Sequence, residues 1–292
     1  MADEVVKPKS TGLLLIGIGP GAISGITSEA LAAAKNADFR RYEAYTALWP
    51  EDELAALERI TGPIDKIMRP EIEHPDEIFQ LAKSHLVAIM VVGDPLQATT
   101  HVDLQLQALE QGIDCQVIHG ISITNLVTGA IGLSNYKFGR QTTLTYPYSN
   151  WIATSPLEVI AVNRALGQHT LALLDLDPTG AGTGQQRPMK PIDALTSIAL
   201  MVEKVAESIE ETDSVGPLSA LRQHALNEMI STPLEDLSVV LCSDMGTDNQ
   251  SIVYAKLTEL ADLPGGEMNC LVFPASTSDV EDKALLRWKK QG

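Results

Sequence analysis

Apolar residues in the first 120 positions fall into short runs that alternate with longer segments of helical periodicity. The short runs predict buried strands at residues 13–18, 39–42, 86–92 and 115–118. The helical spacing predicts helices at residues 28–35, 51–60, 75–84 and 102–111, with Ser28 as a candidate cap of the first. Such alternation is typical of a parallel sheet covered by helices. We therefore expect an N-terminal α/β domain over residues 1–120.

The pattern changes after residue 120. Small and apolar residues with Ser122 predict a helix that begins near this serine and joins two halves of the chain. Further apolar runs predict a second sheet from strands at residues 142–146, 170–176, 239–242, 252–256 and 270–273, with a long helix at 192–205. We expect a C-terminal α/β domain over residues 121–292. Residues 177–186 and 207–236 are interpreted as insertions or mobile loops. The second segment is acidic and helical in pattern, with breaks at Gly216-Pro217 and Pro233.

Composition narrows the function classes. Hydrophobic residues make up 45% of the chain, enough for a full core in each domain. No apolar run approaches the ~20 residues that span a bilayer, and residues 1–10 do not resemble a signal peptide, so we expect a cytoplasmic protein without membrane association. A net charge of −17 repels phosphates, so direct nucleic-acid binding is not expected. Cys115, Cys242 and Cys270 are widely spaced, which favours buried thiols and no metal site.

A glycine turn follows the first predicted strand. The run Gly17-Ile18-Gly19-Pro20-Gly21-Ala22 fits G-x-G-x-x-A, so a dinucleotide-binding fold has to be considered. Pro20 removes one N–H group that such a loop would direct at a pyrophosphate, and Glu43 comes late for a ribose-binding acid. A tight turn that lets a ligand or the second domain approach the backbone fits these residues better.

A second glycine turn, Gly93-Asp94-Pro95, follows the strand at 86–92 and precedes Thr99, Thr100 and His101. Open α/β sheets hold ligands at a strand end that leads through a glycine turn into a helix. The first helical turn offers unpaired N–H groups, and the two threonines could cap it. The alternative is structural, with Asp94 and Thr99 acting only as caps.

These two turns resemble the family of S-adenosylmethionine (SAM) methyltransferases that includes the tetrapyrrole methylases. The resemblance covers about residues 12–275 and favours the archaeal form of one branch. That branch is marked by Glu43-Ala44-Tyr45-Thr46, Ala98-Thr99-Thr100-His101, Ile118-His119 with Ser122-Ile123, Tyr136-Lys137-Phe138-Gly139, Tyr146-Pro147 with Asn150-Trp151, Thr154-Ser155-Pro156 and His169-Thr170-Leu171 with Leu174-Asp175.

The resemblance implies two α/β domains with SAM in the cleft between them, and a homodimer. It also implies repeated methylation of the amino group of a 3-amino-3-carboxypropyl histidine on translation elongation factor 2, in diphthamide biosynthesis. Carried over residue by residue, the SAM contacts fall on Pro20, Asp94, Gln97, Ser122, Ile123, Leu174, Met245 and Asn269.

Methyl transfer to an amine requires the amine to lose a proton. The sequence names no base, and Thr99, Thr100 and His101 are weak candidates by their place near the expected cleft. Three other functions stay open at this point. They are methylation of a corrin or porphyrin precursor, NAD-dependent oxidoreduction suggested by the first glycine turn, and a non-catalytic binding module on the translation machinery.

Overall fold

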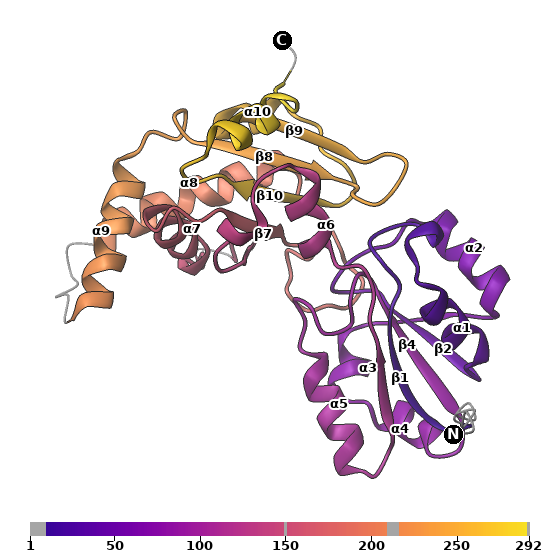
Figure 1. Ribbon diagram of the computed structural model, residues 1–292. Helices are drawn as coiled ribbons and strands as arrows, with labels where there is room; N and C mark the ends of the chain where they lie inside the picture. Colours follow the sequence, from indigo (N-terminus) through magenta and orange to yellow (C-terminus); the bar gives the residue numbers. More distant parts are fainter. Residues whose placement is uncertain (1–9, 149–150, 209–215, 291–292) are drawn as a thin grey trace, which may run out of the picture. The chain divides into compact units, whose positions relative to one another are not determined.

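The computed structural model describes residues 10–148, 151–208 and 216–290 and divides into two compact units (Figure 1). The first unit comprises residues 1–123 and 181–184, and the second comprises 124–180 and 185–292. Each unit has its own five-stranded sheet with helices packed on it. The expectation of an α/β fold with two α/β parts is confirmed. Asn150, one of the family-like residues, lies outside the described part.

In the first unit strands and helices alternate along the chain. The elements are β1 (Gly12–Gly17), α1 (Ser28–Asn36), β2 (Phe39–Glu43), α2 (Glu51–Thr61), β3 (Asp65–Ile67), α3 (Arg69–Glu73), α4 (Asp76–Ala82), β4 (Leu86–Val91), α5 (His101–Glu110) and β5 (Cys115–Ile118). The strand order is β3-β2-β4-β1-β5, and every pairing is parallel. The strands expected from apolar runs are all present. The short elements β3 and α3 were not predicted.

Both faces of the first sheet are buried, which explains why its central strands are apolar throughout. In β1, Leu14 and Ile16 pack with α1 and α2 on one face, whereas Leu13 and Leu15 pack with α4 and α5 on the other. The strand β4 is buried along its whole length in the same way.

The connections of this sheet reverse direction between β1 and β4. From β1 the chain passes through α1 to β2, which lies beyond β4, and from β4 it passes through α5 to β5, which lies beyond β1. The loops that follow β1 and β4 therefore diverge at neighbouring strand ends. Ligands of open α/β sheets bind at such a switch point, outside the carboxyl ends of the strands.

The second unit has a mixed sheet. Its elements are α6 (Ile123–Ala130), the 3-10 helix η2 (Asn135–Lys137), β6 (Thr142–Leu144), α7 (Ser155–Ala165), β7 (Thr170–Leu174), α8 (Pro191–Ser208), α9 (Pro217–Ser231), β8 (Ser238–Ser243), β9 (Ser251–Lys256), the 3-10 helix η4 (Leu257–Asp262), β10 (Asn269–Phe273) and α10 (Asp279–Leu286). The order is β6-β7-β10-β8-β9, in which only β6 and β7 pair in parallel.

One apolar cluster joins this sheet to α7, α8 and α9. The helical pattern expected in residues 207–236 is confirmed for α9. This helix contributes Ala225, Leu226 and Met229 to the core, so the interpretation as an insertion or mobile loop is wrong for it. Among the described residues no helix is both long and apolar enough to cross a membrane.

Three local expectations need correction. The cap of α1 is Thr27, whose side chain accepts a hydrogen bond from the Ala30 N–H, and Ser28 is the first helical residue. Thr100 stands at the N-cap of α5 but makes no side-chain cap bond, because its backbone is not extended there. Cys115 is half-buried rather than buried, since β5 lies at the edge of its sheet.

Candidate functional site

The loops after β1 and β4 are joined by a reciprocal pair of backbone hydrogen bonds. Gly19 N–H donates to Gly93 O over 3.2 Å, and Gly93 N–H donates to Gly19 O over 2.9 Å. Both glycines have positive φ, at 77° and 76°, a conformation that other residues seldom adopt. The glycine turn of the first strand and the Gly93-Asp94 turn thus form one rigid structure at the switch point.

Glycines also let the loop after β5 approach these two turns. A side chain on Gly120 would overlap the backbone of Gly93 and Gly17, and one on Gly17 would overlap Gly120. The strand β1 lies between β4 and β5 and ends at Gly17. The loops after β4 and β5 therefore meet over Gly17. The first glycine turn is thus approached closely by the backbone of another loop of its own unit, whereas the sequence predicts an approach by a ligand or by the second domain.

Asp94 reaches across the end of β1 to the loop after β5. Its Oδ1 accepts a hydrogen bond from the Leu96 N–H at 2.9 Å, and its Oδ2 accepts one from the Gly120 N–H at 3.3 Å. The same Oδ2 lies 2.7 Å from Nδ1 of His119. Asp94 therefore does not cap α5. Its buried carboxylate holds the loops after β4 and β5 together.

The weak catalytic candidates of the sequence lie on the segment that follows. His101 is fully buried, and its Nδ1 lies 3.1 Å from Pro95 O. The ring therefore stabilises the Gly93-Asp94-Pro95 turn from inside the protein. Burial lowers the pKa of His101, which keeps the ring neutral. Its Nε2 and the Thr99 hydroxyl are buried without a hydrogen-bond partner, and Thr100 is exposed.

The remaining first-unit candidates surround the same strand ends. Pro20 follows the Gly19 bridge and is half-buried, whereas Gln97 is exposed on the turn that Asp94 begins. Ser122 is buried immediately before α6, and Ile123 is its first residue, as expected for a helix that begins near Ser122. The structure thus brings Pro20, Asp94, Gln97, Ser122 and Ile123 to one edge of the first sheet.

A second buried carboxylate stands at this edge, at the end of β2. Glu43 is fully buried and accepts hydrogen bonds from the Thr46 N–H at 3.0 Å and the Tyr45 N–H at 3.3 Å. Burial raises the pKa of Glu43, although these bonds and one from the Thr46 hydroxyl oppose the shift. The family-like run Glu43-Ala44-Tyr45-Thr46 therefore forms a turn that is stabilised by hydrogen bonds to its own Glu43 carboxylate.

The three second-unit candidates gather at one edge of the second sheet. Leu174 ends β7, Asn269 begins β10, and Met245 follows β8 by two residues. Asn269 pairs with Ser243, and β10 runs antiparallel to both β7 and β8, so all three residues lie at the same end of the strands. Leu174, Met245 and Asn269 are all buried.

The Asn269 amide is fully engaged within the protein. Its Oδ1 accepts hydrogen bonds from the Ser243 hydroxyl at 2.7 Å and the Gly266 N–H at 2.8 Å. Its Nδ2 donates to Gly266 O at 3.0 Å and to Met189 O at 3.3 Å. An amide has two acceptor and two donor positions. A ligand at this edge therefore meets the main chain around Asn269 and not its side-chain amide.

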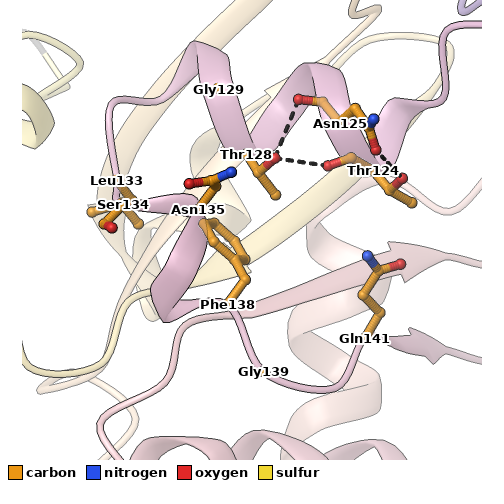
Figure 2. Close-up of a pocket in the computed structure, with 10 residues that line it drawn as sticks. All are labelled: Thr124, Asn125, Thr128, Gly129, Leu133, Ser134, Asn135, Phe138, Gly139 and Gln141. Atoms are coloured by element: carbon orange, nitrogen blue, oxygen red, sulfur yellow. Dashed lines mark hydrogen bonds between the residues drawn. The ribbon is translucent and has the colours of Figure 1, made fainter.

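The second unit also has an open pocket of about 580 Å³ (Figure 2). Hydroxyl and amide side chains of α6 and the segment that follows it line the pocket, including Thr124, Asn125, Thr128 and Asn135, with Phe138 at its wall. None of the predicted site residues lines it. Among the described residues no group of three or more His, Cys, Asp or Glu side chains is arranged to hold a metal ion.

His119 is the functional candidate that sequence reasoning missed. The sequence indicates it only as part of a family-like run, because its partner Asp94 lies 25 residues earlier in the chain. Asp94 follows β4, and β4 is not adjacent to β5, the strand that His119 follows. A signal was available, since both residues follow predicted parallel strands whose carboxyl ends share one edge.

The comparisons with known proteins agree with this geometry. The profile of the Tetrapyrrole (Corrin/Porphyrin) Methylases matches residues 12–261. The diphthine synthase of Methanothermobacter thermautotrophicus is 31% identical over 276 residues, which cover 94% of this chain and 94% of that protein. That of Haloquadratum walsbyi is 29% identical over 279 residues, 94% and 93% of the two chains. The match to the Methanoregula boonei diphthine synthase is 37% identical but spans 66% of that relative's length.

Solved structures give the same result at the level of the whole fold. A diphthine synthase crystal structure has a TM-score of 0.74 at 26% identity and covers 95% of each chain. A solved structure from Entamoeba histolytica has a TM-score of 0.76 at 28% identity and covers 97% of this chain and all of that one. The chain is a methyltransferase that belongs to the tetrapyrrole methylase family and, within it, to the diphthine synthases.

Proposed function

We propose that this protein transfers methyl groups from SAM to the amino group of a 3-amino-3-carboxypropyl histidine on translation elongation factor 2, repeatedly, to give diphthine. The observation that carries the proposal is the similarity to diphthine synthases over 94% of the chain, through both units. The diphthine synthases of Haloquadratum walsbyi and Methanothermobacter thermautotrophicus, which match with this coverage, are archaeal, and this supports an archaeal type of enzyme.

The residues at the switch point fit SAM in their chemistry. SAM has hydroxyl and ammonium donors and a carboxylate acceptor. A carboxylate has about four acceptor positions, and internal bonds occupy three at Asp94, so one position is open to a hydroxyl or ammonium donor. The first turn of α6 supplies backbone N–H donors for an anionic group.

The second-unit residues suit an adenine ring. Leu174 and Met245 provide apolar side chains, and the main chain near Asn269 provides polar groups for the ring edge. We propose that SAM is held by the eight residues that the resemblance implies, which are Pro20, Asp94, Gln97, Ser122, Ile123, Leu174, Met245 and Asn269.

Bound SAM supplies a methyl group on a sulfonium centre that is already a good leaving group. The protein has to hold the amine in line with that methyl group and exclude water from it. The linked turns at Gly19 and Gly93 suit this task, because a pair of backbone hydrogen bonds fixes their separation. A rigid site limits the loss of rate that small displacements cause.

Calorimetry with S-adenosylhomocysteine (SAH), NAD and a corrin precursor tests the cofactor. We expect SAH to bind and to stabilise the protein by ~2.7 kcal/mol at a hundredfold excess over its dissociation constant, and we expect NAD to have no effect. Binding of NAD without SAH contradicts the proposal and supports the oxidoreductase alternative suggested by the first glycine turn.

Transfer of labelled methyl groups tests the substrate. The acceptor is elongation factor 2 that carries the unmethylated 3-amino-3-carboxypropyl histidine, and the control is the same factor with an unmodified histidine. Label on the first protein only supports the proposal. Label on a corrin or porphyrin precursor instead favours a tetrapyrrole methyltransferase, the activity after which the matching family is named. SAH binding without transfer to either favours a binding module.

We further propose that the protein is a cytoplasmic homodimer, as the resemblance implies. Sedimentation equilibrium at micromolar concentration tests the oligomeric state, and a monomer mass excludes the dimer.

A further inference from the structure

His119 and Asp94 form a pair in which the two side chains differ sharply in exposure. The carboxylate of Asp94 is 7% exposed, whereas the imidazole of His119 is 72% exposed, and Nδ1 and Oδ2 are 2.7 Å apart. The pair stands at the switch point of the first sheet, where the loops after β1, β4 and β5 meet. Nothing in the fold requires an exposed imidazole at this position, because the Gly120 and Leu96 N–H groups already bind the carboxylate.

The arrangement leaves one ring nitrogen available. The Asp94 carboxylate accepts a hydrogen bond from Nδ1–H, which keeps the ring proton on Nδ1 and places the lone pair of the neutral ring on Nε2. A carboxylate in this position also fixes the ring orientation and stabilises the imidazolium that forms when Nε2 takes a proton. From this geometry we propose that His119 accepts the proton of the substrate amino group and that Asp94 is its positioning residue.

The inference rests on the proposed function, because it concerns the proton of an amine that is to be methylated. An ammonium group has no lone pair for attack. Its N–H bond breaks as Nε2 of His119 binds the proton, and the freed lone pair forms the bond to the methyl carbon. The carbon–sulfur bond breaks at the same time, and its electron pair stays on sulfur. The product amine carries the positive charge and releases a proton before the next round.

Other groups at this edge are less suited to the role. His101 is fully buried with Nδ1 at Pro95 O, and the Glu43 carboxylate faces its own turn. The charged group that faces the His119 ring within the first unit is Asp94. Neither the loop after β1, residues 18–22, nor residues 120–123 carry an ionisable side chain.

The test replaces His119 with asparagine. The amide nitrogen of asparagine takes the place of Nδ1 and can still donate to Asp94, but no proton acceptor replaces Nε2. We expect His119→Asn to lower the single-turnover rate of methyl transfer by about 100- to 10,000-fold near neutral pH. SAH affinity should change less than threefold. His74→Asn, at an exposed histidine of the same unit, is the matched control and should keep the wild-type rate.

The pH profile separates proton transfer from a structural role. The wild-type rate should fall as pH decreases, because a ring that already carries a proton on Nε2 cannot accept the proton of the amine. The variant should lose this dependence and recover at alkaline pH, where the free amine forms in solution, or on addition of imidazole. An unchanged rate at neutral pH overturns the proposal. A parallel loss of SAH affinity overturns it as well, because His119 then belongs to the cofactor site.

A measurement without turnover distinguishes failure of this inference from failure of the proposed function. Nitrogen-15 NMR of the imidazole rings should show His119 with its proton on Nδ1 in the neutral form, and Asp94→Asn should abolish that preference. A proton on Nε2 overturns the proposal whatever substrate the enzyme uses. If the wild-type protein methylates no elongation factor but His119 has the expected tautomer, the substrate assignment is at fault and not the role of the pair.

Discussion

The two units each contain a histidine bound to a carboxylate, and the pairs differ in what surrounds them. In the first unit His119 is 72% exposed beside the buried Asp94. In the second unit His169 is fully buried, and its Nε2 lies 3.1 Å from Oε1 of Glu281, which is 5% exposed. The same pair of functional groups thus has solvent access in one unit and none in the other.

Hydrogen-bond saturation accounts for the contrast. Both nitrogens of His169 are engaged, because Nδ1 accepts from the Ala275 N–H at 3.0 Å. Glu281 in turn binds the Ser134 N–H at 3.0 Å and Nζ of Lys137 at 2.9 Å, which fastens α10 to the segment after α6. No ring nitrogen of His169 is left for a substrate. A histidine–carboxylate pair therefore indicates chemistry only where one nitrogen stays available.

The largest expected effect is on stability in the second unit. Replacing Glu281 by alanine removes the partner of a buried histidine and of Lys137, and such losses cost about 3–5 kcal/mol. Urea unfolding followed by tryptophan fluorescence measures the change. Asp279→Ala, at an exposed acid of the same helix, is the control and should cost no more than about 1 kcal/mol. Equal costs for the two variants contradict a structural role for the buried pair.

Substitution in the Asp94–His119 pair should change ligand affinity rather than stability. We expect Asp94→Ala to weaken SAH binding by about 1.5–3 kcal/mol, the scale of a hydrogen bond to a charged group. The fold should persist, since the residue lies on a turn and the core of the unit is elsewhere. Calorimetry measures the affinity, with Asp103→Ala on the exposed face of α5 as control. Unchanged affinity limits Asp94 to holding the loops and positioning His119.

The pairs also predict how stability depends on pH. Burial lowers the pKa of His169, while the hydrogen bond to Glu281 opposes the shift. Burial would raise the pKa of Glu281, but hydrogen bonds from Lys137, Ser134, Ser278 and His169 together hold it well below its usual range.

Both folded-state pKa values lie below those of the unfolded chain, so both groups stabilise the fold fully at neutral pH. Unfolding releases a neutral imidazole that takes up a proton once the pH is below about 6.5, its usual pKa. The free energy of unfolding should therefore fall as pH decreases from 7.5 to 5.5. His169→Asn should flatten this dependence. An equal slope in wild type and His169→Asn excludes His169 as its source.

The smallest effect is expected in the loop of residues 177–186. Thr183 and Gln185 are exposed there, whereas Gly182 is buried and its carbonyl accepts from the Arg69 N–H at 3.1 Å. Replacing Thr183 and Gln185 by alanine should change SAH affinity by less than ~0.5 kcal/mol. Slower methylation of intact elongation factor 2 then identifies the loop as a docking segment. Loss of SAH affinity assigns it to the cofactor, and no change in either makes it a tolerated insertion.

The sequence predicts best those helices and strands whose buried faces appear as a regular pattern of apolar residues. Strands β1 and β4 are buried on both faces, and α8 has a continuous apolar face, so all three were expected. Strand β3 has three residues and helix α3 has five, which is too short for a period to be recognised. The sequence does not predict helix α7 either. It does predict helical structure around α9, which lies between the expected breaks at Gly216-Pro217 and Pro233.

The site could be located from sequence only as far as single strand ends. The glycine turns at 17–22 and 93–95 lie where the pattern indicated, at the ends of β1 and β4. What joins them depends on strand order, which the local pattern does not contain. Asp94 meets His119 because β1 alone separates β4 from β5, and because Gly17 at its end has no side chain in between.

The division of the chain into units has a consequence for attempts to take the protein apart. Residues 181–184 belong to the first unit although both flanking segments belong to the second, so the backbone passes from one unit to the other three times. A single proteolytic cut removes at most one of these three crossings, so at least two peptide connections between the units remain. A fragment that stops at residue 123 lacks the Gly182 carbonyl that binds Arg69. The first unit is therefore not encoded by one contiguous gene segment. Recombination that exchanges this unit has to transfer residues 181–184 together with residues 1–123.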